Sequence, residues 1–600
     1  MPLKSKLQWI KTQSRYTYFK SVYKNYNWRM LLLKHKLHFL SFYYGHALVL
    51  YLMITSLEKI RYILCLMLKR DKYRFGNKKS SSIGVGVGNT NNLIMAVNQL
   101  KAGAILNYVI LALNAIIGLT YIPYMLRMLG QSEYGIYSLA ASVIAYLSML
   151  DFGFGNAVIR YTAKYRSLND TEKQYSMFGM FTILYTIIGV ISFIAGLILY
   201  FNVYEFFGDK LTPEEIEKTK DVILLMLLNL SISFPLSIYG AIITAYEDFI
   251  FIRVVNIIQT LLSTALIIVL LSFGYKALAL VVVKTIFNLL VLLINVFYCK
   301  YKIKIKVRFD NIDKKLLKEI LIYSSWIFLI MIMDKIYWST GQFVLGAVAG
   351  TTAISIYAVA IQLQQIYMMF SGAISSVFLP RVTSIVAQGD DYKIISDLFI
   401  RTGRLQYIVM SLILTGFFLF GKPFILYWAG TSYEDSYYVT LMFFVALTIP
   451  MIQTLGLSIL QARNQMRFRA LMFVVIAIVA FAAQIILARK YGVIGCAMAV
   501  SVALLLGQGL IINIYYQKRQ YIEIGKFWKE IGKMSAIPLL MSVVWYIILE
   551  YITIDSLYEL VALIVVYVIV YIPLFWKYSL NLDERELISK SLKKIRSILK

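Results

Sequence analysis

The sequence predicts an all-α integral membrane protein with about fourteen transmembrane helices, arranged as two six-helix lobes followed by two further helices. Three observations carry this prediction. Hydrophobic residues make up 60% of the 600 residues and charged residues only 15%, against about 25% charged residues in soluble proteins. Apolar stretches of about twenty residues or more recur along the chain, and each can cross a hydrocarbon core of about 30 Å. The third observation is an internal repeat, described below.

Fourteen apolar segments after Lys101 are long enough to span a bilayer, because a helix rises about 1.5 Å per residue. We expect these helices at residues 104–126, 136–159, 178–203, 221–244, 251–273, 277–299, 319–347, 353–380, 405–428, 436–461, 468–488, 492–516, 534–552 and 557–576.

The loops between these segments alternate in charge. Acidic loops, such as 129–135 and 204–219, alternate with basic loops, such as 164–173 and 300–315. Positive charge collects on the cytoplasmic side of membrane proteins. We therefore expect the basic loops, and both ends of the region 95–600, to lie in the cytoplasm.

The first 94 residues differ from the rest. They hold 17 Lys and Arg, only two acidic residues and all three histidines, and residues 80–92 have the composition of a flexible linker. Two interpretations stay open: an extension upstream of a functional start at Met95, unstructured or never translated, or a basic arm on the anionic cytoplasmic leaflet. The segment lacks the compact layout of a signal peptide. Since the basic excess belongs to a membrane protein, it does not predict a nucleic-acid partner.

The internal repeat relates two halves of the chain. GQSEYGIYSLA (130–140) aligns with GTTAISIYAVA (350–360) at an offset of 220 residues, and residues 274–300 align with 492–518 at an offset of 218. The alignment pairs Gly130 with Gly350, and Gly274 with Gly492. Because each half has an even number of helices, both should have the same orientation, as in alternating-access transporters whose substrate path runs between two lobes.

This repeat divides the chain into five parts. We expect a basic extension at 1–94, an N-lobe at 95–300, a basic cytoplasmic linker at 301–316, a C-lobe at 317–519, and the last two helices with a basic tail at 520–600.

Ionisable residues deep within the predicted helices are candidates for a substrate pathway, because charges are costly in a bilayer. Lys284, Asp334 and Lys335 are the deepest. Our main interpretation is a water-filled cavity between the lobes, in which Lys284 and Lys335 bind an anionic substrate. The alternative is a structural pair between an acidic and a basic side chain of different helices.

Further cations lie near the cytoplasmic helix ends, where they could ring a vestibule or simply snorkel to the interface. The candidates for the ring are Arg160, Arg253, Arg381 and Arg404. The repeat pairs Arg160 with Arg381.

Asp151 is a second kind of candidate. It interrupts an apolar run within LDFGFGNAVIRYTAKY (150–165), and in the repeat its place is taken by Ser371. A single acid that breaks the symmetry of two lobes is a candidate for ion coupling or for a salt bridge between the lobes, as is Asp334.

The region 95–600 has no histidine and no nucleotide-binding motif, and the three cysteines of the chain are scattered. Enzymes need positioned acids, bases or nucleophiles, and metal sites need clustered ligands. We therefore expect a transporter that needs no metal or other cofactor, with coupling to protons or sodium ions left open.

The segment 125–165 resembles the N-terminal signature of Wzx-type oligosaccharide flippases. These are polysaccharide biosynthesis proteins of the multidrug/oligosaccharidyl-lipid/polysaccharide (MOP) exporter superfamily. The similarity continues at MDKIYWSTGQFVLGAVAGTTAISIYAVA (333–360), where the family typically has an acid in helix seven, and it covers 95–600.

This resemblance implies a MATE-like two-lobed fold in the bacterial plasma membrane. It also implies that undecaprenyl-diphosphate-linked oligosaccharides move to the outer leaflet by alternating access, for surface polysaccharide biosynthesis. Membrane lipids, a polysaccharide polymerase and glycosyltransferases are the implied partners. Two alternatives remain: a flippase for peptidoglycan precursors, and a multidrug or cation exporter, which would favour an acidic cavity.

Overall fold

The computed structural model describes residues 87–309, 314–375, 382, 384–386, 391–463, 465–586 and 589. All regular structure within these residues is helical. Both interpretations of the N-terminal extension concern residues that lie mostly outside this range. The expected linker at 80–92 overlaps the first helix, which already begins at Val87.

The N-lobe is built from eight helices and two short turns of helix. They are α3 (Val87–Leu129), α4 (Gln131–Leu147), η1 (Ser148–Asp151), α5 (Phe154–Ser167), α6 (Thr171–Phe201), α7 (Val203–Phe207), α8 (Pro213–Ala245), α9 (Phe249–Ser272), α10 (Ala277–Tyr298) and η2 (Cys299–Ile303).

The C-lobe follows, and two long helices complete the chain. The elements are α11 (Lys314–Trp338), α12 (Thr340–Val348), α13 (Thr351–Ser375), α15 (Tyr392–Trp428), η3 (Thr431–Tyr433), α16 (Ser436–Ile452), α17 (Thr454–Ala462), α18 (Arg467–Leu504), η4 (Leu505–Ile511), α19 (Ile512–Arg519), α20 (Ile524–Glu550) and α21 (Leu557–Tyr578).

The described residues contain eleven helical segments long and apolar enough to cross a membrane, or twelve when the bent pair α16–α17 counts as one span. The predicted number of fourteen is therefore not confirmed. The difference arises at two places. The expected segments 468–488 and 492–516 are joined in one helical stretch, Arg467–Arg519, but the φ of 57° and ψ of −133° at Gly492 are not helical, so two helices meet there as expected. The expected segment 319–347 is interrupted after Trp338 and divides into α11 and α12.

The backbone supports the internal repeat at its paired glycines. Gly130 and Gly350 have φ of 79° and 85° and immediately precede α4 and α13. Gly274 and Gly492, paired at the other end of the repeat, have φ of 86° and 57°. Glycine adopts positive φ without the steric cost that a side chain imposes. The two lobes therefore turn their chains in the same way at equivalent points.

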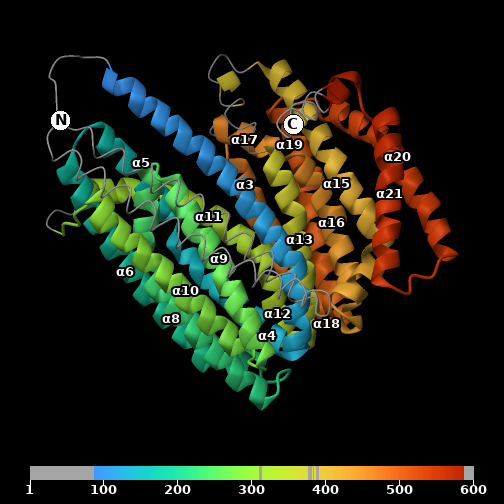
Figure 1. The fold of residues 1–600 in the computed structure, drawn as a ribbon, viewed down its shortest axis with the longest axis horizontal. Helices are drawn as coiled ribbons and strands as arrows, with labels where there is room; N and C mark the ends of the chain where they lie inside the picture. Colours follow the sequence, from blue (N-terminus) through green and yellow to red (C-terminus); the bar gives the residue numbers. More distant parts are fainter. Residues whose placement is uncertain are drawn as a thin grey trace, which may run out of the picture.

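The two lobes meet at one end of the molecule and diverge at the other (Figure 1). They lie side by side at the lower end of the view, where α4 of the N-lobe packs against α12 and α13 of the C-lobe. The loops at this end include the acidic segments around Glu133 and Glu434, so we call it the acidic-loop end. The opposite end, which carries the basic segment 300–309, is the basic-loop end.

The connection from N-lobe to C-lobe packs closely on α6. The N–H of Arg308 donates to the Tyr175 carbonyl at 3.2 Å, and the guanidinium lies 3.5 Å from Glu172. A Cβ at Gly179 would overlap the carbonyl oxygen of Arg308, so only glycine fits beneath the connection. The start of the expected linker is thus fixed to the basic-loop end of the N-lobe.

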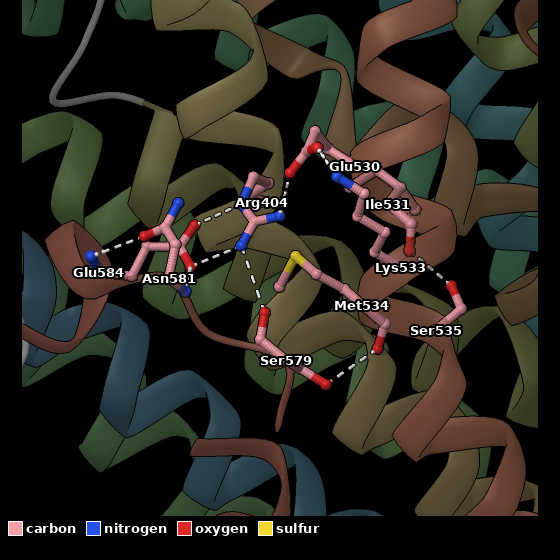
Figure 2. A network of polar contacts seen from close by, with 9 residues as sticks. All are labelled: Arg404, Glu530, Ile531, Lys533, Met534, Ser535, Ser579, Asn581 and Glu584. Carbon is pink, nitrogen blue, oxygen red and sulfur yellow. Dashed lines mark hydrogen bonds and ion pairs between the residues drawn. The ribbon is translucent and has the colours of Figure 1, made fainter. Parts of the chain in front are cut away.

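A buried ion network attaches the last two helices to the C-lobe (Figure 2). The guanidinium of Arg404 in α15 donates hydrogen bonds to both carboxylate oxygens of Glu584, at 2.6 and 2.8 Å. It also donates to the carboxylate of Glu530 in α20, at 2.9 Å. Arg404 and Glu584 are only 5% and 2% exposed. Such two-pronged pairs are the strong form of charge-assisted hydrogen bond. The network therefore holds α20, and the chain beyond α21, against α15.

We expect Arg404→Ala to destabilise the protein, because it leaves Glu584 buried without its cation. Removing one partner of a buried ion pair typically costs about 3–5 kcal/mol. Thermal unfolding of the purified protein should shift to a clearly lower temperature. Arg401→Ala is the matched control, since Arg401 lies on the same helix but is exposed. Equal unfolding temperatures for the two variants would contradict the structural role of the network.

Candidate functional site

Lys284 of α10 and Lys335 of α11 line the same cavity, which has a volume of about 400 Å³. Its remaining walls come from α4, η1 and α8. Lys284 lies seven residues after the start of α10, about 10 Å along the helix. The structure thus brings together the two lysines that the sequence singled out, and we call this space the lysine cavity.

Tyr137 of α4 orients Lys284. The Lys284 ammonium donates a hydrogen bond to the Tyr137 hydroxyl and lies 4.7 Å from the centre of the ring. Aromatic faces attract cations, so the tyrosine can hold the charged amine without neutralising it. The positive charge stays available to a ligand.

Uncharged polar groups form the wall between α8 and α10. The Asn288 amide donates to the side-chain oxygens of Asn229 and Ser233, both at 2.8 Å. Asn229 and Ser233 are four residues apart on α8, and so are Lys284 and Asn288 on α10. The two members of each pair therefore lie on one face of their helix. Polar side chains are costly against lipid, and these avoid that cost because they line a cavity and hydrogen-bond to one another.

The cavity has a positive character. Its lining contains two lysines and no Asp or Glu among the described residues. No described carboxylate forms an ion pair with either lysine, although the side chain of Asp334 lies outside the described residues. Two cations in one cavity repel each other and attract an anion. The site therefore suits a ligand with at least one negative charge, such as a phosphate.

The acidic-loop end is closed directly beyond this cavity, with Glu215 at the centre of the closure. The sequence Thr212-Pro213-Glu214-Glu215 starts α8 with a capping box and a proline in the first turn, which fixes the Glu215 side chain. One carboxylate oxygen then accepts hydrogen bonds from Ser132 at 2.5 Å and from Thr351 at 2.8 Å. One side chain thus ties α8 and α4 of the N-lobe to α13 of the C-lobe.

Backbone contacts complete the closure. A Cβ at Gly135 would overlap the carbonyl group of Thr351, so α4 and the start of α13 approach as closely as glycine permits. Arg127 donates to the Tyr427 carbonyl at 2.7 Å, and Gln131 donates to the Ser432 carbonyl at 2.5 Å. Burial raises the pKa of the neighbouring Tyr433 to about 12, so this hydroxyl stays neutral at the closed end.

The other predicted cations do not join the lysine cavity. Arg160 is exposed on α5 and Arg253 is half-buried on α9. Arg404 is engaged in the buried network described above, so its guanidinium faces Glu584 and Glu530 rather than a vestibule. Arg381 lies outside the described residues.

Asp151 also lies apart from the two lysines. It ends the turn η1, and Phe152 and Gly153 follow with φ of 52° and 66° before α5 begins. Its carboxylate lies against the Tyr185 hydroxyl and the Gly153 backbone, inside the N-lobe. The interruption in 150–165 is thus a break between two helices, and its acid points to α6 rather than across the lobes.

Sequence reasoning missed the polar wall of Asn229, Ser233 and Asn288. The signal was present, because Asn229 and Ser233 in LLNLSIS, and Lys284 and Asn288 in VKTIFNLL, are each four residues apart. Uncharged polar residues four positions apart mark a helix face that avoids lipid, as ionisable residues do.

The two-lobed arrangement of membrane helices is shared with solved structures of membrane proteins. The fold is similar to that of the lipid II flippase MurJ in an inward closed conformation, with TM-score 0.62 and 18% identity, over 81% of this chain and 99% of MurJ. It is also similar to a multidrug resistance MATE family transporter of the MOP superfamily, inward-facing, with TM-score 0.53 and 16% identity, over 69% of this chain and 99% of that one.

Two sequence comparisons also find similar proteins. The family model for polysaccharide biosynthesis proteins matches residues 100–386. A curated protein of Shigella flexneri, whose name assigns it provisionally to O-antigen transport, is 21% identical over 417 residues, which cover 67% of this chain and 94% of that protein. These matches confirm the predicted resemblance to polysaccharide biosynthesis proteins.

We expect Gly135→Ala to loosen the acidic-loop end, because the added methyl group overlaps the Thr351 carbonyl. A cysteine at the buried position Thr351 should then react several-fold faster with a water-soluble maleimide than it does with Gly135 intact. Gly532→Ala is the matched control, since a Cβ there meets no atom within 4 Å. If both alanine variants leave the labelling rate unchanged, Gly135 does not hold the closure.

Proposed function

We propose that this protein is a flippase that moves undecaprenyl-diphosphate-linked oligosaccharides across the bacterial plasma membrane by alternating access, for surface polysaccharide biosynthesis. The proposal rests on one observation: a cationic cavity and an apolar pocket meet at consecutive residues of α11. The comparisons support the general class, a transporter or flippase related to polysaccharide biosynthesis proteins, and the lipid-linked substrate is our inference.

The apolar pocket lies between the lobes and has a volume of about 370 Å³. Ile336 of α11 lines it, together with Tyr146 of α4, Phe343 of α12 and Ile478 of α18. Ile478 is 59% exposed, so the pocket is continuous with the membrane-facing surface. Lys335 lines the lysine cavity and the next residue lines this pocket. A ligand spanning the two must be anionic at one end and apolar at the other, as a polyprenyl diphosphate is.

The charge of the loops sets the proposed direction of transport. By the positive-inside rule the basic-loop end faces the cytoplasm, and both ends of the region 95–600 then lie there. Because the acidic-loop end is closed, the described conformation would receive the diphosphate headgroup from the cytoplasmic side. Breaking the contacts of Glu215 and Gly135, with closure at the basic-loop end, would release it to the outer leaflet.

The exporter alternative requires a different cavity. A cationic drug would be repelled by two lysines, and the described lining of the lysine cavity contains no carboxylate to bind it. The peptidoglycan-precursor alternative shares the diphosphate chemistry and is separated by experiment below. Proton or sodium coupling through Asp151 or Asp334 remains a proposal, as does assembly with a polymerase and glycosyltransferases.

We predict that Lys284→Gln and Lys335→Gln each reduce surface polysaccharide at least about tenfold in cells that depend on this protein. A hydrogen bond to a charged group is worth about 1.5–3 kcal/mol, and about 1.4 kcal/mol corresponds to a factor of ten. Surface polysaccharide is measured with a glycan-specific antibody or lectin, at membrane levels of protein equal to wild type.

Lys490→Gln is the matched control, because Lys490 is an exposed lysine on α18 outside the lysine cavity. Normal polysaccharide in both cavity variants would refute the cationic mechanism. Cell lysis on depletion of the protein, with normal surface polysaccharide before lysis, would instead assign it to peptidoglycan precursors.

A further inference from the structure

Three interruptions of membrane helices meet around a second cavity, which lies within the C-lobe and has a volume of about 400 Å³. Helix α11 ends at Trp338, α16 and α17 are separated at Gln453 by a bend of 41°, and the α18 span contains the π-helix η4 with Gln508. All three residues line this C-lobe cavity. Broken helices and π-helical turns in membrane proteins frequently mark ligand sites.

The side chain of Gln453 carries a buried hydrogen-bond acceptor that no described residue satisfies. Its side chain is 4% exposed, and its amide nitrogen donates to the Asn513 side chain at 2.9 Å. Its carbonyl oxygen, Oε1, accepts no hydrogen bond from any described residue. A buried acceptor without a donor costs free energy, so a ligand with a hydroxyl or N–H group at this point would be stabilised.

Other lining groups have the same uncharged character. Thr454 accepts a hydrogen bond from Gln406 at 2.5 Å, which leaves the threonine hydroxyl hydrogen available to donate. Gln508 presents a second amide from η4. Amides and hydroxyls both donate and accept, which matches a ligand rich in hydroxyl groups better than a simple anion.

The charge and the aromatic groups exclude a cation and favour a ring-shaped ligand. Arg469 is the one charged residue in the described lining, and its guanidinium lies 5.0 Å from the centre of the Phe473 ring. Trp338 and Tyr337 add two more aromatic side chains to the wall. The C–H faces of sugar rings pack on aromatic rings, while their hydroxyls point outward to amides.

The C-lobe cavity adjoins the lysine cavity through α11. Met331, Lys335 and Trp338 are spaced by four and three residues, so they share one helix face. The middle residue lines the lysine cavity, and the other two line the C-lobe cavity. A group attached to a phosphate at Lys335 is therefore within reach of Trp338.

We propose that the C-lobe cavity is a sugar-binding subsite, which holds the sugar nearest the diphosphate of the lipid-linked substrate. This inference rests on the proposed function. The Gln453 and Gln508 amides bind the sugar hydroxyls, Trp338 supports the face of the ring, and Lys335 holds the adjoining phosphate.

The test compares two probes bound to the purified full chain in nanodiscs: a polyprenyl diphosphate, and the same lipid carrying one N-acetylglucosamine. We expect the sugar to tighten binding to the wild-type protein by about fivefold or more. Trp338→Ala and Gln508→Met should reduce this gain to less than about twofold while the sugar-free lipid binds as before. Gln362→Met is the matched control, since Gln362 is a half-buried glutamine of α13 outside both cavities.

Each outcome decides the proposal. A sugar gain that is absent in the wild-type protein, or unchanged in both variants, would overturn the subsite while leaving the proposed flippase function standing. Failure of the wild-type protein to bind either lipid would refute the proposed function itself. Gln508→Met is expected to fold normally, because the Gln508 side chain makes no hydrogen bond to a described residue that the substitution would remove. This variant therefore keeps the test valid if Trp338→Ala misfolds.

Discussion

The arrangement depends on one constraint, which is that a bilayer does not tolerate unpaired charge. Lys284 and Lys335 lie within membrane helices, and no described carboxylate neutralises either one. Such residues persist only where they face water or a ligand. The constraint explains the polar wall of Asn229, Ser233 and Asn288, which would be equally costly against lipid. It also explains why the lobes must separate at one end, since a sealed cavity would leave two cations without solvation.

Helix α11 is where the parts of the proposed substrate would meet. Its last turn presents Lys335 to the lysine cavity, Ile336 to the apolar pocket and Trp338 to the C-lobe cavity. The chain then breaks before α12, which packs against α4 at the closed end. A movement that opens the acidic-loop end would therefore displace α12 and could change all three spaces together. This places binding and closure on one continuous stretch of chain.

Sequence reasoning predicted the fold class, the two lobes and the pair of lysines, because hydropathy, repeated glycines and buried charge are all local signals. It could not show that Arg404 pairs with Glu584, 180 residues away, since that contact depends on how α20 and α21 pack. It also left 319–347 unbroken, whereas this segment divides into α11 and α12. Apolar composition says little about an interruption after Trp338, because tertiary packing decides it. The polar wall is encoded in the four-residue spacing of uncharged side chains, which is also a local signal.

The most direct test of the central claim is the accessibility of a cysteine placed in the lysine cavity. Ser148→Cys on a Cys65→Ser background suits this purpose, because Ser148 lines the cavity and Cys299 and Cys496 are buried. The rate of labelling by a membrane-impermeant maleimide is measured on inside-out and right-side-out vesicles, with and without a short-chain polyprenyl diphosphate. The account predicts faster labelling from the cytoplasmic face and protection by the diphosphate. Labelling only from the opposite face, or a rate that the diphosphate does not change, would contradict it.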